Sequence, residues 1–143
     1  MSPAGGNRSG FTLIELLVTL AIAGLMLSLV PPLLGKGGGR ARLDHDGRLL
    51  TDELRLARSR AIVGDKDVLL RFDPGQGRFG IDGLDHTLSP GIAASIDSPA
   101  DEPGAVRFRP DGSASGAVIR LVNDSGSLVL SVDWLTGAIE RTP

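Results

Sequence analysis

The sequence predicts an α+β protein in which one long amino-terminal helix precedes a domain of short antiparallel strands. The first observation is an apolar run from residue 11 to residue 34, in which Phe11–Val30 contains a single charged residue, Glu15. The second is a change of hydrophobic period after Gly64, from helical spacing to short alternating runs bounded by turn residues. About a hundred residues follow the apolar run, which suits one small domain.

Residues 11–34 have the length and composition of a membrane-spanning helix. Twenty helical residues with a rise of about 1.5 Å each extend about 30 Å, which is the thickness of the hydrocarbon core of a bilayer. A carboxylate at the centre of a bilayer costs roughly 2.5 to 3.5 kcal/mol, so Glu15 requires a specific role. The preceding residues 1–10 are polar and carry only Arg8 as a charged side chain, as expected of a short leader.

The residues Gly10-Phe11-Thr12-Leu13-Ile14-Glu15-Leu16-Leu17 resemble the type III signal of type IV pilins and pseudopilins. The resemblance implies that a prepilin peptidase cuts after Gly10 and methylates the new amino terminus at Phe11. It also gives Glu15 a partner, because a carboxylate in low dielectric can pair with the amine of a neighbouring subunit as helices pack into a filament. The domains expected on this basis are a leader peptide at 1–10, a transmembrane and assembly helix at 11–34, and a periplasmic domain at 35–143.

Three other interpretations of the apolar run explain less of it. The tripeptide Ala21-Ile22-Ala23 fits a secretory cleavage site, but the run continues beyond it and Glu15 would lie in the core of the signal. An ordinary membrane anchor explains the length but not Glu15 or the Gly10-Phe11 pair. A soluble buried helix is the weakest alternative, because such helices rarely contain eighteen consecutive apolar residues.

Residues 31–39 are expected to interrupt the helix. Pro31 and Pro32 each lack a backbone donor, and Gly35 and Gly37–Gly39 add backbone freedom, so we expect a kink or local unwinding here. The positive-inside rule, applied to the basic residues after the run, would place this end in the cytoplasm. The opposite orientation, with a cytoplasmic leader and a periplasmic domain in a single-pass inner-membrane protein, follows from the family resemblance.

An amphipathic helix is predicted at about residues 40–63. Its apolar positions recur at spacings of three, four and seven, and they are Leu43, Leu50, Leu54, Ala57 and Ala61. Asp44 and Arg48, and Asp52 and Arg55, are spaced to form ion pairs on the helix surface. The basic residues Arg55, Arg58 and Arg60 suggest an anionic partner, but charges of mixed sign are more often the solvated face of a helix.

Residues 67–141 are expected to form an antiparallel sheet or sandwich. The seven candidate strands are 68–72, 78–81, 91–96, 105–109, 117–122, 128–134 and 138–141. The clearest hairpin connects two of them through Asn123-Asp124-Ser125-Gly126, residue types that adopt tight turns. Leu128, Leu130 and Val132 alternate with Val129, Ser131 and Asp133, so one face of that strand is expected to be buried.

Three further segments extend the resemblance over most of the chain. Residues 54–61 (Leu-Arg-Leu-Ala-Arg-Ser-Arg-Ala), 108–113 (Phe-Arg-Pro-Asp-Gly-Ser) and Thr136-Gly137 resemble the H-type minor pseudopilins of type II secretion, the general secretion pathway protein H family, and the related FimT-like minor pilins. The family fold is a pilin-like helix that carries a β-sheet domain. The resemblance implies a structural subunit of the pseudopilus that assists export of folded proteins across the outer membrane. A minor type IV pilin acting in pilus assembly, adhesion or DNA uptake is the alternative.

No catalytic constellation stands out, so no enzyme activity, cofactor or metal is expected. His45 lies between Asp44 and Asp46, but adjacent helical residues point in different directions. Two loop clusters could contact calcium, although neither has the spacing of a calcium loop, and turns collect Asp for other reasons. These clusters are Asp82, Asp85 and His86, and Asp97, Asp101 and Glu102.

Composition narrows the expected partners. The chain has no Cys, which excludes disulfides and thiolate chemistry. From residue 40 onward it contains 13 Lys or Arg and 16 Asp or Glu, a net charge of −3, so no nucleic-acid binding is expected. The expected partners are instead other pseudopilins, which bind through the amino-terminal helix, the prepilin peptidase and the inner membrane.

Overall fold

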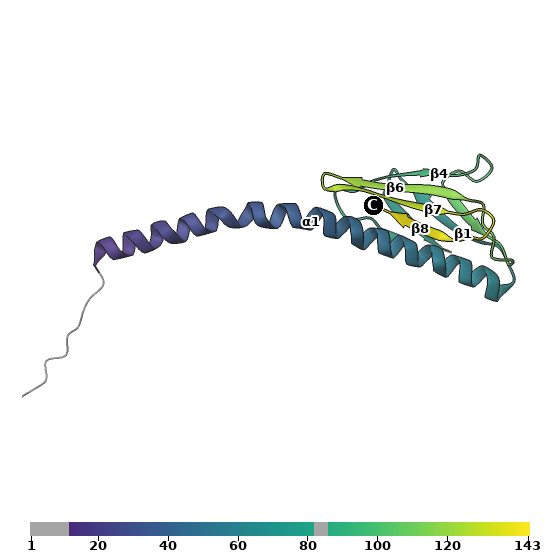
Figure 1. Cartoon of the computed structure of the whole chain (residues 1–143), viewed down its shortest axis with the longest axis horizontal. Coiled ribbons are helices and arrows are strands. Elements are labelled where there is room, and N and C mark those ends of the chain that lie inside the picture. Colours follow the sequence, from purple (N-terminus) through teal and green to yellow (C-terminus); the bar gives the residue numbers. More distant parts are fainter. Residues whose placement is uncertain (1–11, 82–85) are drawn as a thin grey trace, which may run out of the picture. The chain divides into compact units, whose positions relative to one another are not determined.

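The computed structural model describes residues 12–81 and 86–143, except for the side chains of residues 27–37. It contains one helix, α1 (Leu13–Gly64), followed by short strands (Figure 1). The chain divides into two compact units, Met1–Lys36 and Gly37–Pro143, and α1 contributes to both. The strands are β1 (Val68–Asp73), β2 (Arg78–Ile81), β3 (His86–Thr87), β4 (Ala93–Asp97), β5 (Ala105–Phe108), β6 (Ala117–Asn123), β7 (Gly126–Val132) and β8 (Ile139–Thr142).

The strands form two antiparallel sheets. Sheet A has the order β3-β2-β1-β5 and sheet B has the order β4-β6-β7-β8. All seven predicted strands are present, with ends that differ by at most two residues. The two-residue strand β3 was not predicted, because it is too short to show a hydrophobic period and is defined by its pairing with β2. The α+β fold class is confirmed.

The β6–β7 hairpin follows the prediction closely. Asn123 pairs with Gly126 across the turn, which leaves Asp124 and Ser125 as a two-residue loop. Oδ1 of Asn123 accepts a hydrogen bond from the backbone N–H of Ser125 at 2.8 Å, and Gly126 has a positive φ of 146°. These are the turn-forming properties for which Asn and Gly are selected. Leu128, Leu130 and Val132 on β7 are buried, as their alternation predicted.

The helix is continuous where an interruption was expected. α1 is helical throughout residues 31–39, so the prediction of local unwinding there is wrong. A proline removes one backbone hydrogen bond from a helix, while its fixed φ is itself compatible with helical geometry. The intact turns on either side can therefore maintain the helix through Pro31 and Pro32.

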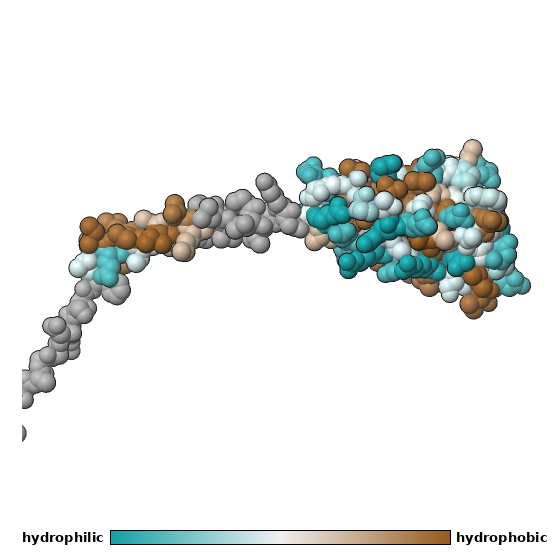
Figure 2. Space-filling view, in the orientation of Figure 1, coloured by the Kyte–Doolittle hydropathy of each residue, from teal (hydrophilic) through white to brown (hydrophobic). Residues whose placement is uncertain are grey.

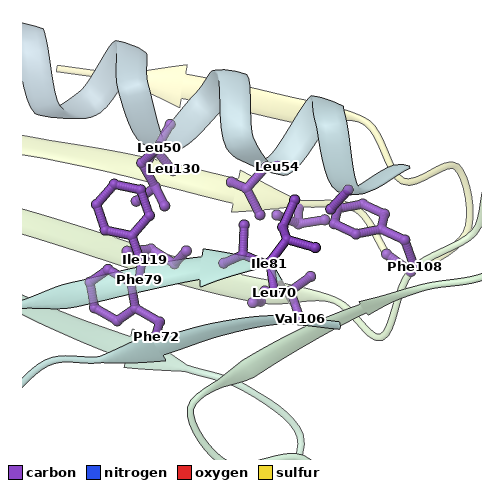
Figure 3. Close-up of a cluster of buried hydrophobic side chains, with 14 of the residues drawn as sticks. Leu50, Leu54, Leu70, Phe72, Phe79, Ile81, Val106, Phe108, Ile119 and Leu130 are labelled. Carbon is purple, nitrogen blue, oxygen red and sulfur yellow. The ribbon is translucent and has the colours of Figure 1, made fainter. Parts of the chain in front are cut away.

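One face of α1 forms the centre of the hydrophobic core. The five predicted positions, Leu43, Leu50, Leu54, Ala57 and Ala61, are all completely buried. Figure 3 shows the side chains of Leu50 and Leu54 pointing from the helix toward core residues of both sheets. The core continues through inward residues of sheet A and sheet B, which include Leu70, Phe79, Ile81, Val106, Phe108, Ile119, Leu121, Leu128 and Leu130.

The helix approaches sheet B closely at Gly47. A Cβ atom at this buried position would lie 2.7 Å from Cδ2 of Leu128 on β7, which is too short for a normal contact. Gly47 therefore lets the helix backbone lie directly on a core leucine. The oxygen of Gly47 also accepts a hydrogen bond from Oγ1 of Thr51 at 2.7 Å, so the polar group on the next turn has a partner within the helix.

Of the two ion pairs predicted on the helix surface, one is present and the other forms with a different basic residue. Asp52 and Arg55 form the expected pair, with Oδ1 and Nη1 3.8 Å apart. Asp44 lies near Arg40 instead of Arg48, with Oδ2 3.7 Å from Nε of Arg40. Both basic residues are four positions from Asp44, so spacing alone could not choose between them.

Arg58 connects the end of α1 to two turns that are distant in sequence. Its Nε donates to the oxygen of Gly112 at 3.1 Å, and its Nη2 donates to the oxygen of Thr136 at 2.9 Å. Gly137 has a φ of 62°, and a Cβ there would lie 2.3 Å from the Gly112 oxygen and 2.9 Å from Nε of Arg58. The three segments that carried the extended family resemblance therefore meet at this one arginine.

We expect Leu50→Asp and Leu54→Asp to lower the free energy of unfolding of the domain by about 3 kcal/mol or more, because each would bury an unpaired charge. The measurement is urea denaturation of a fragment of residues 37–143, which retains the Gly39 oxygen that accepts from Nδ2 of Asn123. Arg48→Ala, at an exposed position on the same helix, should change the value by no more than about 0.5 kcal/mol. Equal stability of the leucine variants and the parent would contradict the packing of α1.

Arg58→Ala should lower the free energy of unfolding by about 2 kcal/mol, because it removes two hydrogen bonds donated by a charged group. The exposed Arg55→Ala is the matched control, since its pair with Asp52 is solvent-exposed and contributes little. Arg58→Lys should be intermediate, because an ammonium lacks the planar fork that reaches both carbonyls. Identical denaturation curves for the Arg55 and Arg58 variants would show that these hydrogen bonds do not stabilise the domain.

Candidate functional site

The start of α1 is capped by a residue within the signal-like motif. The backbone N–H of Glu15 donates to the oxygen of Thr12 at 3.1 Å, and it also lies 3.4 Å from Oγ1 of Thr12. The N–H of Leu16 donates to the same Thr12 oxygen at 3.2 Å. Thr12 therefore acts as the helix N-cap, and the spacing Thr-x-x-Glu is that of a capping box. The cap places Glu15 in the first turn, where a carboxylate interacts favourably with the helix dipole.

The first turns of α1 expose apolar side chains on all sides. The side chains of residues 12–26 are exposed, and Figure 2 shows a nearly continuous hydrophobic surface on the face of this segment in view. Its large apolar residues are Leu13, Ile14, Leu16, Leu17, Val18, Leu20, Ile22, Leu25 and Met26. Apolar surface of this extent calls for a lipid or protein partner. Within residues 12–26, 38–81 and 86–143, no helical stretch is both long and apolar enough to cross a bilayer.

The structure describes one of the three predicted site residues. Glu15 is exposed in the first turn of α1, whereas Gly10 and Phe11 lie outside the described residues. The cleavage site and the methylated terminus therefore stay predictions from the motif. The capping role of Thr12 was missed in the sequence, although the Thr-x-x-Glu spacing before an apolar run is a recognisable signal for it.

Buried carboxylates on α1 fasten the helix to the segment before β4. Asp46 accepts hydrogen bonds from the backbone N–H of Ser89 at 2.6 Å and from its hydroxyl at 3.0 Å. About two helical turns after Asp46, Oε1 of Glu53 lies 3.0 Å from Nε2 of His86. The ring of His86 also lies against Phe79, with 5.4 Å between ring centroids. These contacts are structural and join the helix to sheet A.

The structure separates the residues considered for an acid–base unit at His45 and for metal sites in the loops. His45 is exposed while Asp46 is buried against Ser89, so this pair points in different directions and forms no acid–base unit. His86 interacts with Glu53, and its proposed metal partners Asp82 and Asp85 lie outside the described residues. Glu102 is paired with Arg107, which also contacts Asp67 at 3.2 Å. Within the part of the chain that the structure describes, no three His, Asp or Glu side chains are placed to hold a metal ion.

The basic stripe on α1 is divided among different contacts. Arg58 donates to the Gly112 and Thr136 carbonyls, and Arg55 pairs with Asp52. Arg60 is exposed. Since two of the three guanidinium groups already have partners in the domain, the solvated-face interpretation fits the structure better than an anion-binding surface.

Comparisons with known proteins agree with the geometry of the amino-terminal segment. Residues 5–31 match the prokaryotic N-terminal methylation motif, which spans the predicted cleavage site, the Thr12 cap and Glu15. The chain is 28% identical over 141 residues to type II secretion system protein H of Xanthomonas campestris pv. campestris. That alignment covers 94% of this chain and 83% of its relative, so it includes the β-sheet domain as well as the helix.

Solved structures share the fold at low sequence identity. The minor pseudopilin EpsH of Vibrio cholerae has a TM-score of 0.59 and 13% identity, covering 71% of this chain and 96% of that chain. The type IV minor pilin FimU of Pseudomonas aeruginosa has a TM-score of 0.54 and 17% identity, covering 73% of this chain and 91% of that chain. Both of these proteins have a pilin-like fold, which this chain shares. With its amino-terminal methylation motif and its similarity to a protein H along nearly the whole sequence, the chain resembles the H-type minor pseudopilins.

Proposed function

We propose that the chain is a structural subunit of the type II secretion pseudopilus and assists export of folded proteins across the outer membrane. The observation that supports this role is the division of α1 between two kinds of surface. Residues 12–26 expose apolar side chains on all sides, whereas from Leu43 to Ala61 one helix face is buried in a folded domain. The first part is available to lipid and to other helices, and the second carries the domain.

The proposed assembly pathway follows from the motif at the start of α1. A prepilin peptidase cuts after Gly10 and methylates the amine of Phe11, while the apolar segment holds the subunit in the inner membrane with its domain in the periplasm. Other pseudopilins then pack against this segment. The carboxylate of Glu15 pairs with the Phe11 amine of a neighbouring subunit, where low dielectric strengthens their attraction.

A structural role also accounts for the chemistry of the domain. Its buried carboxylates contact serine, histidine or arginine side chains that fix the fold, as Asp46 and Glu53 do. The minor type IV pilin is the alternative function, and it shares this fold. The near full-length similarity to a protein H supports the pseudopilin over the pilin. The net charge of −3 from residue 40 onward would repel DNA phosphates, so neither the similarity nor the charge supports a role in DNA uptake.

We expect the mature protein to begin at Phe11 with a methylated amine. The measurement is mass spectrometry of the full chain extracted from membranes of a host that has the prepilin peptidase. A strain without that peptidase is the control and should yield the chain with its leader. An amino terminus at Met1 in the first strain, or at Gly24 after the Ala21-Ile22-Ala23 tripeptide, would contradict the proposal.

Glu15→Ala should leave membrane insertion intact and reduce crosslinking to other pseudopilins several-fold, because the neighbouring amine loses its counter-charge. Glu15→Gln separates charge from capping, since glutamine keeps the capping-box spacing but is neutral. Both variants should therefore assemble poorly. Membrane fractionation confirms insertion in each case. Normal crosslinking of Glu15→Gln would assign the residue to helix capping and remove the charge pair from the mechanism.

A further inference from the structure

A groove crosses the outer face of sheet B at the end where β7 leads into β8. It encloses about 900 Å³ and is lined by Asp97, Ser98, Pro99, Ser115, Gly116, Ala117, Val118, Ser131, Val132, Asp133, Trp134, Leu135, Thr136, Ala138 and Glu140. Of the contacts described above between α1 and the domain, one reaches a lining residue, through the backbone oxygen of Thr136, and none uses an outward side chain of the groove. All of its lining residues belong to the unit Gly37–Pro143.

The floor of the groove is one row of side chains across four strands. Asp97 on β4 pairs with Val118 on β6, Val118 pairs with Ser131 on β7, and Ser131 pairs with Glu140 on β8. Directly paired residues project from the same face of a sheet, so the row has small or apolar residues at its centre and a carboxylate at each edge. Three strand spacings of about 4.8 Å put the two acidic residues roughly 14 Å apart.

Trp134, whose backbone is held by a hydrogen bond, lines the groove. The oxygen of Trp134 accepts a hydrogen bond from the N–H of Ala114 at 3.0 Å, and a Cβ at Gly116 would lie 3.2 Å from the Cβ of Trp134. The side chain nevertheless remains 65% exposed, and that of the neighbouring Leu135 is 63% exposed. Large aromatic side chains are typical anchors of protein interfaces, and a backbone that is already fixed loses little conformational entropy when a partner binds.

The charge of the groove is negative. The lining contains three carboxylates, Asp97, Asp133 and Glu140, and no Lys or Arg. Hydrogen bonds from the N–H and hydroxyl of Thr136 and the N–H of Leu135 lower the pKa of Asp133 and keep it ionised at neutral pH. Arg120 is on the same face of β6 but two residues from Val118, and it does not line the groove. Anionic lipids and nucleic acids are therefore disfavoured.

We infer that this groove binds a cationic, partly apolar segment of a partner protein. In an extended segment, side chains four residues apart project from the same side and lie about 13 Å from each other, which matches the spacing of Asp97 and Glu140. Two basic side chains can thus reach the two edge carboxylates while an aliphatic residue between them covers Val118. One basic side chain also lies against the indole of Trp134, where a cation–π interaction adds to the attraction. The inference is independent of the helix-mediated assembly proposed above.

The test is a titration of the full chain, held in non-ionic detergent, with the peptide acetyl-Gly-Lys-Ser-Leu-Ser-Lys-Gly-amide. Trp134 is the only tryptophan of the chain, so its fluorescence reports on the groove directly. We expect a saturable change in emission that weakens as salt is raised, because exposed charges are screened. The same peptide with Glu in place of both Lys residues should give no saturable change.

Substitutions inside and outside the groove test whether the peptide binds there. Neutralising both edges with Asp97→Asn and Glu140→Gln should raise the dissociation constant about fivefold or more, as expected for loss of two exposed ion pairs. Val118→Lys, at a half-exposed position, should abolish binding by placing a cation on the floor. Asp124→Asn, in the exposed hairpin loop at the other end of β6, is the control and should bind normally. Circular dichroism checks that each variant is folded.

Two results would overturn the inference. One is the absence of a saturable change with the lysine peptide, or an equal change with the glutamate peptide. The other is binding that survives both Val118→Lys and the double neutralisation in folded protein. Either result leaves the cleavage and crosslinking experiments on the helix unaffected.

Discussion

The burial of one face of α1 is the constraint on which the rest of the domain depends. Sheet A and sheet B have separate strand orders, and the helix contributes side chains to the core that both sheets share. Three leucines of this face, Leu43, Leu50 and Leu54, are fully buried. Each contributes about 1.5 to 3 kcal/mol by leaving water, and the sum is comparable with the whole stability of a small domain.

Polar contacts along the two edges of this buried face fix how the helix lies. Asp46 and Glu53 are seven residues apart on one edge and contact Ser89 and His86. Asn123 donates to the oxygen of Gly39 at 2.7 Å, and Arg58, on the other side of the buried face, donates to two turn carbonyls. Hydrophobic burial favours the association but is not directional, whereas these hydrogen bonds require a particular rotation and position of the helix.

Periodicity in the sequence predicted the buried face of α1 and the seven longer strands, because each depends on neighbours within a few residues. Periodicity could not predict contacts between residues that are distant in the sequence. Arg58 finds its acceptors 54 and 78 residues away, and nothing in the local pattern distinguishes it from Arg55 or Arg60. The groove at Trp134 likewise requires the register of four strands, which places Asp97 and Glu140 at opposite edges of one row. The motif at Glu15 could be recognised because its residues are contiguous.

The cap at Thr12 has a consequence for the helix if the chain is cut after Gly10 as proposed. The groups that satisfy the first turn, the oxygen and hydroxyl of Thr12, belong to a residue that would stay on the chain after such a cleavage. The secondary structure therefore needs no contribution from the leader. Removing the leader would, however, bring a positive amine next to the helix end that already carries a partial positive charge. That local repulsion raises the free energy of an isolated mature subunit, and a carboxylate close to the amine relieves it.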